Sequence, residues 1–292
     1  SHTVEILSVG TELLLGNIAN TDAQMLSQGL SELGLNVFWH TVVGDNLQRA
    51  EEAVALAKQR ADIIITTGGL GPTYDDLTKQ TICKTFNREL ELHEDILEEL
   101  KTWFQTKMGK KMPENNIQQA MLPVDCTIFD NPVGTAPGCA FVEDGVHVLM
   151  LPGPPFECRY MFEHRAAPYL EKLTDGVIVS HEIKVFGMGE SAVEEALHEP
   201  MTTNPTLAPY AKTNECMVRA TARAESREKA EELLTPLVRE VCETLGDVVY
   251  GVDVGSLEEV VSGLLAERGL TLAAAESCTG GLLSKRMTDL PG

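Results

Sequence analysis

The stretch Asp62-Ile63-Ile64-Ile65-Thr66-Thr67-Gly68-Gly69-Leu70-Gly71-Pro72-Thr73-Tyr74-Asp75-Asp76-Leu77-Thr78 decides the fold of this chain. Its β-branched first part, Asp62 to Thr67, predicts a buried strand. The glycines end that strand in a tight turn, and a helix is expected from about Leu77 to Phe86. A strand that passes through a glycine-rich turn into a helix is typical of the carboxyl edge of a parallel sheet, where open α/β folds bind their ligands.

The segments before this stretch repeat the same alternation of strand and helix. Short apolar runs predict strands over Val4–Val9 and Val37–Val43, and amphipathic spacing predicts helices over Thr21–Leu33 and Gln48–Lys58. Alternating strands and helices indicate βαβ units. The first domain, residues 3–173, is therefore expected to be α/β, with a doubly wound and mainly parallel sheet.

Toward the end of the first domain, the alternation of strand and helix gives way to successive strands. Strands are expected over Thr127–Asp130, Gly138–Val142 and Val146–Leu151, with Asp144-Gly145 turning the last two into a hairpin. Helices are expected between the glycine stretch and these strands, over Glu94–Met108 and around Asn115–Met121, and another begins at Phe156.

The rest of the chain predicts a smaller α+β domain and a short third segment. Residues 174–253 follow the order β-α-β-β-α-β, which is typical of a ferredoxin-like module. Residues 254–292 begin with an amphipathic helix, Leu257–Glu267, and continue with an expected strand, Leu270–Ala275. One strand and its neighbouring helices cannot bury a core, so this segment is interpreted as the opening of a further domain.

Composition excludes several classes of partner. The chain has 44 acidic and 23 basic residues in 292, a formal net charge of −21, so neither nucleic acid nor an anionic membrane is expected as a partner. Its apolar runs are too short to span a membrane. Seven scattered cysteines without a Cys-x-x-Cys pair are interpreted as reduced thiols, and the expected compartment is the cytoplasm.

The glycine stretch has the chemistry of a phosphate site. Glycines let the backbone come close to a phosphate and turn its N–H groups toward it, while threonine hydroxyls add donors. By itself such a turn is weak evidence, because it also serves as a simple change of chain direction. The residues assigned to ligand binding in this stretch are Gly68, Gly69, Gly71, Pro72, Thr73 and Thr78.

Asp75 and Asp76 indicate a metal. Carboxylates beside a phosphate repel it, whereas a divalent cation held by them attracts it, and oxygen ligands suit a hard cation such as Mg²⁺, Mn²⁺ or Co²⁺. We therefore assign both aspartates as catalytic and metal-binding. The alternative is that one of them only caps the following helix.

The loop after the first strand is expected at the same edge of the sheet. Glu12 is a candidate for the metal or for positioning water, and Asn17 and Asn20 are candidates for sugar hydroxyls. Caps explain the same residues equally well, with Asn20 or Thr21 starting the helix and Glu12 solvated.

Two further loops carry candidates. Asn131–Gly138 taken alone predicts a structural turn, and Gly134 and Thr135 within it are candidate ligand contacts. Ser277, before Gly280-Gly281 at a strand-to-helix turn, has the setting of an activated hydroxyl. A helix cap is the alternative for Ser277, because the sequence supplies it with no base.

Together these motifs resemble the CinA family, in order and over essentially the whole chain. The first domain of that family is similar to the molybdopterin-binding MoaB/MogA fold, and the resemblance implies that the middle domain, residues 174–253, is KH-like. The motifs that carry the resemblance are Gly10-Thr11-Glu12, Gly16-Asn17, Asn20-Thr21, Gly68 to Thr73, Asp75 to Thr78, Asn131 to Gly138, Leu151 to Pro155 and Glu276 to Gly281.

The resemblance implies a function. The first domain is expected to be a metal-dependent ADP-ribose pyrophosphatase that yields AMP and ribose 5-phosphate, and Ser277 falls at the nucleophile position of a nicotinamide mononucleotide deamidase. Deamidase activity is not expected from this chain, because that domain is incomplete in it; we expect a homodimer. Two alternatives stay open, a pterin- or nucleotide-binding module without catalysis and an oligomerisation scaffold for the amidase domain.

Overall fold

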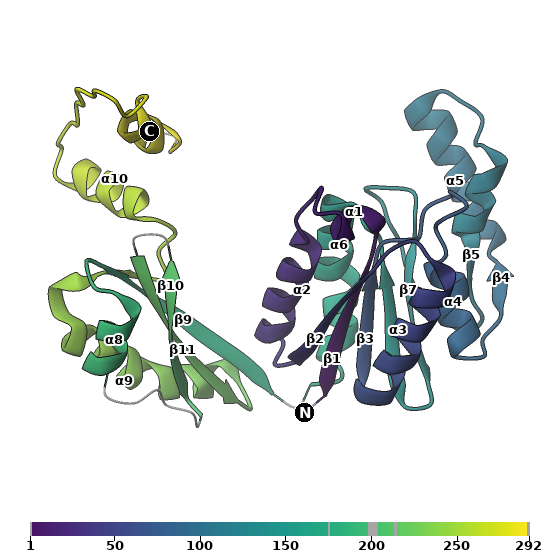
Figure 1. The fold of residues 1–292 in the computed structure, drawn as a ribbon, viewed down its shortest axis with the longest axis horizontal. Helices are drawn as coiled ribbons and strands as arrows, with labels where there is room; N and C mark the ends of the chain where they lie inside the picture. Colours follow the sequence, from purple (N-terminus) through teal and green to yellow (C-terminus); the bar gives the residue numbers. More distant parts are fainter. Residues whose placement is uncertain (1, 175, 198–203, 213–214, 291–292) are drawn as a thin grey trace. The chain divides into compact units, whose positions relative to one another are not determined.

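A six-stranded sheet with the order β2-β1-β3-β8-β7-β6 organises the first part of the chain in the computed structural model (Figure 1). The structure describes residues 2–174, 176–197, 204–212 and 215–290. Strands β2, β1, β3 and β8 run parallel, and β7 and β6 are antiparallel additions at one edge. The strands are β1 (Thr3–Val9), β2 (Asn36–Val43), β3 (Ile63–Thr67), β6 (Thr127–Phe129), β7 (Gly138–Glu143) and β8 (Val146–Leu151).

Helices cover both faces of this sheet, so its central strands are buried on both sides. The helices α3 and α4 pack on one face, and α2, α6 and α7 pack on the other (Figure 1). This explains the unbroken apolar run in β3, where Ile63, Ile64 and Ile65 are all fully buried. Burial of each isoleucine contributes about 2 kcal/mol. The helices are α1 (Thr11–Leu14), α2 (Thr21–Glu32), α3 (Leu47–Arg60), α4 (Thr78–Thr85), α5 (Glu94–Trp103), α6 (Pro155–Met161) and α7 (Ala167–Glu171), with a 3₁₀ helix η2 (Glu114–Ala120) and π-helical turns η1 (Phe104–Met108) and η3 (Phe162–Ala166).

The predicted α/β class and the hairpin are confirmed. Glu143 pairs with Val146 across the turn, and both turn residues have a positive φ, 51° for Asp144 and 79° for Gly145. This backbone is that of the tight turn that favours Asp-Gly between antiparallel strands. A small two-stranded sheet, β4 (Leu90–Leu92) with β5 (Met121–Pro123), was not predicted.

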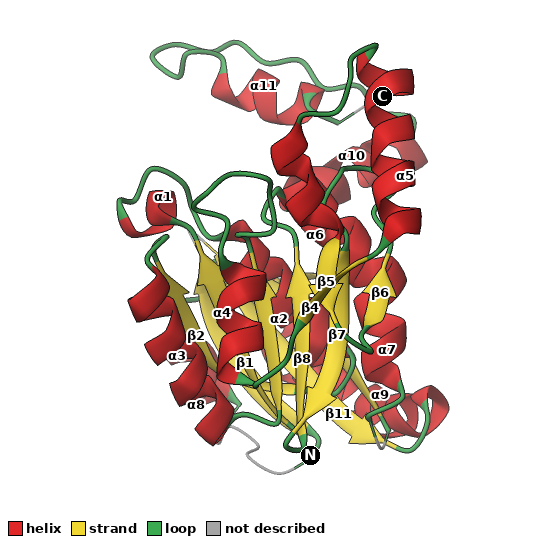
Figure 2. Ribbon diagram, turned by 90° about the vertical axis from the view of Figure 1, so that its right-hand side faces the viewer, coloured by secondary structure: helices red, strands yellow, loops and turns green. Residues whose placement is uncertain are grey.

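The loops that leave β1, β3 and β8 gather at one end of the sheet. Figure 2 shows α1, which follows β1, and the start of α6, which follows β8, at the same upper end of the strands. This is the carboxyl edge, where the sequence places its candidate residues.

The second unit, residues 176–292, has its own antiparallel sheet with the order β10-β11-β9-β12. This is the ferredoxin-like order predicted for the segment. Helix α9 packs against it through a buried stripe that includes Leu234, Leu237 and Val241. The elements are β9 (Val177–Phe186), α8 (Glu190–Ala196), β10 (Thr206–Lys212), β11 (Glu215–Ala224), α9 (Arg227–Leu245), η4 (Gly246–Val248), β12 (Val249–Val252), α10 (Leu257–Glu267) and α11 (Leu282–Thr288).

The predicted strand Leu270–Ala275 is wrong. The segment has no regular structure, and its side chains are exposed, with Leu270 at 56% and Leu272 at 52%. A strand needs a neighbour to satisfy its backbone groups, and no strand within the described ranges pairs with this one. Of the helices that the structure describes, none is both long and apolar enough to cross a bilayer.

Candidate ligand-binding site

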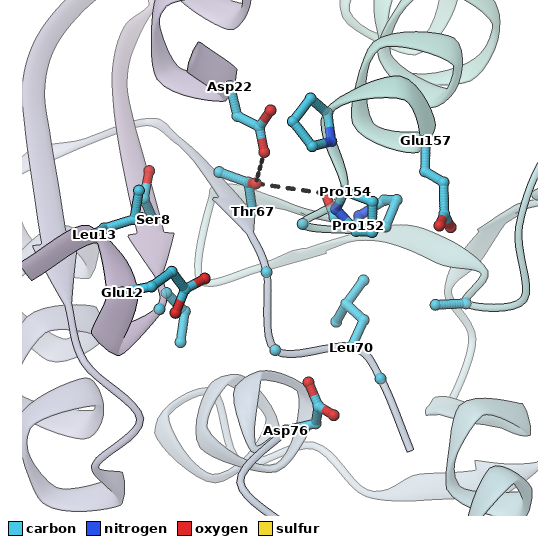
Figure 3. Close-up of a pocket in the computed structure, with 18 of the residues that line it drawn as sticks. Ser8, Glu12, Leu13, Asp22, Thr67, Leu70, Asp76, Pro152, Pro154 and Glu157 are labelled. Carbon is cyan, nitrogen blue, oxygen red and sulfur yellow. Dashed lines mark hydrogen bonds between the residues drawn. The ribbon is translucent and has the colours of Figure 1, made fainter. Parts of the chain in front are cut away.

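A cavity of about 590 Å³ opens at the carboxyl ends of β1, β3 and β8 (Figure 3). Its walls come from the loop after β1 with the start of α2, from the loop 68–76 after β3, and from Pro152 to Pro155 after β8. The loops that follow three neighbouring parallel strands thus meet at one place, as expected for a ligand site in an open α/β sheet.

The loop after β3 needs glycine for two reasons. Gly68 and Gly69 have positive φ values of 93° and 68°. In addition, a Cβ on Gly69 would lie 2.1 Å from the Thr78 hydroxyl, and one on Gly68 would lie 2.3 Å from the Val9 carbonyl oxygen. Any other residue would force the loop away from β1 and α4.

Thr78 supports this loop from behind. Its hydroxyl donates to the Gly68 carbonyl at 2.8 Å, its backbone N–H donates to the Gly69 carbonyl, and its side chain is buried. The predicted ligand residues Gly68, Gly69, Gly71, Pro72 and Thr73 line the cavity, and Thr78 is not among the residues that do.

Asp75 and Asp76, which the sequence analysis assigned to a metal, both line the cavity. An Asp76 carboxylate oxygen accepts from the Thr73 backbone N–H at 2.9 Å and from the Thr73 hydroxyl at 2.5 Å. The capping alternative is wrong, because α4 begins at Thr78 with Leu77 at the cap position and no side-chain cap. Asp76 instead closes the glycine loop on itself.

Of the three candidates in the loop after β1, Glu12 and Asn20 line the cavity and Asn17 does not. Glu12 lines the cavity, and Figure 3 shows its carboxylate beside the glycine loop. Asn20 also lines the cavity and caps α2, since its side-chain oxygen accepts from the Ala23 N–H at 3.2 Å and its amide donates to Ser8 at 3.0 Å. Asn17 is exposed and lies outside the cavity lining.

Three acidic side chains of the cavity, Asp22, Asp45 and Glu157, were not among the candidates of the sequence analysis. Asp22 is buried, and its carboxylate accepts from the Thr67 hydroxyl at 2.9 Å; burial raises its pKa more than this bond lowers it. Glu157 accepts from the Asn131 amide at 2.6 Å, and burial likewise raises the pKa of its carboxyl group. Asp22 lies in the first turn of α2, two residues after the cap residue Asn20, and this position was its one sequence signal.

The remaining candidates are dispersed. Thr135 lines the cavity and accepts from the Gln119 amide at 3.1 Å. Gly134 lies in a second cavity of about 440 Å³ beside α5. Ser277 belongs to the second unit, where its hydroxyl is exposed and 3.7 Å from the Cys278 thiol.

The charged side chains in the described wall of the cavity are all acidic. Six carboxylates line it, and no lysine, arginine or histidine is among the described residues of its wall. Within the described ranges, no three His, Cys, Asp or Glu side chains are already gathered as a metal-binding group. The acidic residues are Glu12, Asp22, Asp45, Asp75, Asp76 and Glu157.

Comparison with known proteins places this cavity in a family. Three family models match the chain in sequence: "Probable molybdopterin binding domain" over residues 5–172, "Damage-inducible protein CinA KH domain" over 180–251 and "CinA C-terminal domain" over 254–292. The chain belongs to the CinA family. The predicted resemblance is thereby confirmed, and the cavity lies within the part matched by the molybdopterin-binding model.

Relatives in the CinA family match almost the whole chain. A "CinA-like protein" of Dictyoglomus turgidum is 49% identical over 290 residues, which cover 99% of this chain and 70% of the relative. A "Putative competence-damage inducible protein" of Clostridium acetobutylicum is 50% identical over 291 residues, covering 99% and 71%. Among solved structures, a CinA protein of unknown function from Thermoplasma acidophilum is 31% identical with a TM-score of 0.52, covering 58% of this chain and 97% of that one.

These comparisons overturn the predicted activity. The matched family model describes a molybdopterin-binding domain, and neither CinA relative carries a name that states ADP-ribose hydrolysis or any other hydrolase reaction. The assignment of the chain as a hydrolase is wrong for the same reason. The statement about deamidation, which was part of that assignment, is withdrawn with it. What stands is a CinA-family chain whose family suggests a small-molecule ligand of the nucleotide type.

Proposed function

We propose that the first unit binds a phosphorylated heterocycle, a pterin or a nucleotide, in the cavity at the carboxyl edge of its sheet, together with a divalent cation. One observation carries the proposal: a glycine loop suited to phosphate lies in a wall that otherwise offers six carboxylates and no basic side chain. The description of the matched family model, a molybdopterin-binding domain, supports the pterin member of this class.

Charge is the reason for including the cation. Two like unit charges about 4 Å apart repel by about 1 kcal/mol in water and by about 4 kcal/mol at the dielectric of a protein surface. A phosphate dianion surrounded by these carboxylates therefore meets a repulsion of several kcal/mol. A divalent cation between them changes the sign of the interaction.

The residues fit a hard cation. All six acidic groups offer oxygen, which Mg²⁺ and Mn²⁺ prefer, and Asp75 and Asp76 lie beside the glycine loop. Mg²⁺ is commonly held by one or two carboxylates together with phosphate and water, so a preassembled cluster of three protein ligands is not needed. Asp75 and Asp76 would hold the cation, and the cation would bridge them to the phosphate.

Titration calorimetry tests the proposal. We expect neopterin monophosphate or ADP to bind in the presence of Mg²⁺ at least tenfold more tightly than with EDTA, and neopterin without phosphate to bind weakly. Comparing the two phosphorylated compounds distinguishes a pterin site from a nucleotide site. Absence of binding by both compounds contradicts the proposed function, and equal affinity with EDTA contradicts the role of the cation.

A further inference from the structure

The glycine loop is held from outside the cavity by side chains of η2. The Gln118 amide donates to the carbonyl oxygens of Gly71 at 2.8 Å and Thr73 at 3.0 Å, and the Asn115 amide donates to that of Pro72 at 3.1 Å. Three consecutive carbonyl groups of the loop are therefore directed toward η2. These bonds fix the orientation of the peptide planes in the cavity wall.

One buried lysine holds η2 in turn. Lys79, on α4, is only 2% exposed, and its ammonium group donates to the backbone carbonyls of Gln118 at 2.6 Å and Gln119 at 3.3 Å. The side chain of Gln119 donates to the Thr135 hydroxyl at 3.1 Å. Lys79 thus supports the short helix that contacts two separate loops of the cavity.

This lysine is costly to bury. Desolvation lowers its pKa to about 8, and the ionisable groups that face it are the Asp76 carboxyl and the thiols of Cys83, Cys126 and Cys139. An aliphatic side chain would avoid the desolvation cost. It would also leave the two η2 carbonyl groups without this donor.

We propose that Lys79 is a positioning residue that acts through η2 to hold the glycine loop in its ligand-binding conformation. Lys79 itself is not among the residues that line the cavity, so it has no direct place on a bound phosphate. The inference rests on the proposed function for its binding consequence. Its structural consequence, the order of the loop, is measurable without any ligand.

The test compares Lys79→Met with Lys84→Met. Lys84 lies on the same helix but is exposed and paired with Glu51 at the surface, so it serves as the matched control. Hydrogen exchange of peptides covering residues 68–77 should become at least tenfold faster in Lys79→Met and stay unchanged in Lys84→Met, without ligand. The melting temperatures of both variants should remain near that of the parent, because loss of the buried charge offsets loss of its two bonds.

Binding of ADP with Mg²⁺ gives the second readout. We expect Lys79→Met and Gln118→Leu each to weaken binding at least tenfold, and the double variant to bind no worse than the weaker single one, because both changes release the same loop. The affinity of the parent should fall as pH rises through about 8, and that of Lys79→Met should not. Cys126→Ser should retain the parent's pH profile, which excludes the neighbouring thiol as the titrating group.

The outcomes separate the two proposals. Unchanged loop exchange in a folded Lys79→Met protein contradicts the inference, as does faster exchange that extends equally over the whole first unit. If Lys79→Met does not fold, unchanged loop exchange in Gln118→Leu contradicts it. Failure of the parent protein to bind either phosphorylated compound contradicts the proposed function. The role of Lys79 in ordering the loop is then tested by the hydrogen-exchange result alone, because that experiment uses no ligand.

Discussion

Substitution of Asp76 by asparagine should have opposite effects with and without a divalent cation. Asparagine has nearly the same shape and keeps a side-chain oxygen that accepts from the Thr73 N–H and hydroxyl, so the loop closure at 2.9 and 2.5 Å is preserved. Only the negative charge is removed. Any change in affinity therefore reports the electrostatics of the cavity, not the shape of the loop.

The size of the effect follows from the partial exposure of Asp76. One unit charge about 4 Å from another is worth between about 1 and 4 kcal/mol across the range from water to protein surface. With Mg²⁺ present, Asp76→Asn should weaken binding of ADP or neopterin monophosphate by about tenfold or more, which is about 1.4 kcal/mol. With EDTA the same variant should bind equally well or more tightly, because one repulsive charge is gone.

Calorimetry on Asp76→Asn and on Asp144→Asn measures this reversal. Asp144 is a suitable control because its side chain is 63% exposed in the β7–β8 turn, at the amino end of β8, and Asn-Gly also suits that turn. Weaker binding of Asp76→Asn to the same extent in Mg²⁺ and in EDTA would refute the electrostatic reasoning. So would an equal effect of Asp144→Asn.

Three further predictions concern stability. Gly69→Ala should lower the free energy of unfolding by at least 1 kcal/mol in urea titrations, because its Cβ would lie 2.1 Å from the Thr78 hydroxyl at a φ of 68°; stability equal to the parent would contradict this geometry. Asp22→Asn should raise the melting temperature at pH 7, because burial raises the pKa of this carboxyl group and its charged form is disfavoured; the gain should vanish in acid, where both proteins are neutral at this position. His181 in the second unit is bonded through both ring nitrogens to carboxylates, and although burial lowers its pKa, these bonds raise it overall. Its stabilisation should be complete below the pKa of histidine in the unfolded chain and be lost as pH rises through the higher folded pKa, a dependence that His181→Gln should remove from thermal melts.

The sequence predicts the central sheet well because its signals are local. The apolar run of β3, the glycines after it and the Asp-Gly turn each act within a few residues. The strand predicted over Leu270–Ala275 shows the limit of this reasoning. Local propensity favoured a strand, but strand formation depends on a partner elsewhere in the chain.

For the candidate site too, the sequence located the residues that are contiguous and missed those that long-range contacts bring together. The glycine loop with Asp75 and Asp76 is contiguous in sequence and could be located from it. Asp22, Gln118 and Lys79 enter the site through contacts that span 45, 47 and 39 residues, and no spacing rule relates such positions. Lys79 is buried where its ammonium group reaches from α4 to the carbonyl groups of η2, and composition alone could not indicate this.

The central claim is that a phosphate and a divalent cation occupy the cavity together. A crystal structure of the protein with Mn²⁺ and neopterin monophosphate or ADP tests it most directly, because anomalous scattering locates the manganese. The account predicts one manganese ion coordinated by Asp75 or Asp76 and by a phosphate oxygen, with the phosphate on the backbone of residues 68–73. A phosphate bound elsewhere, or bound in this cavity with no manganese beside it, would contradict the account.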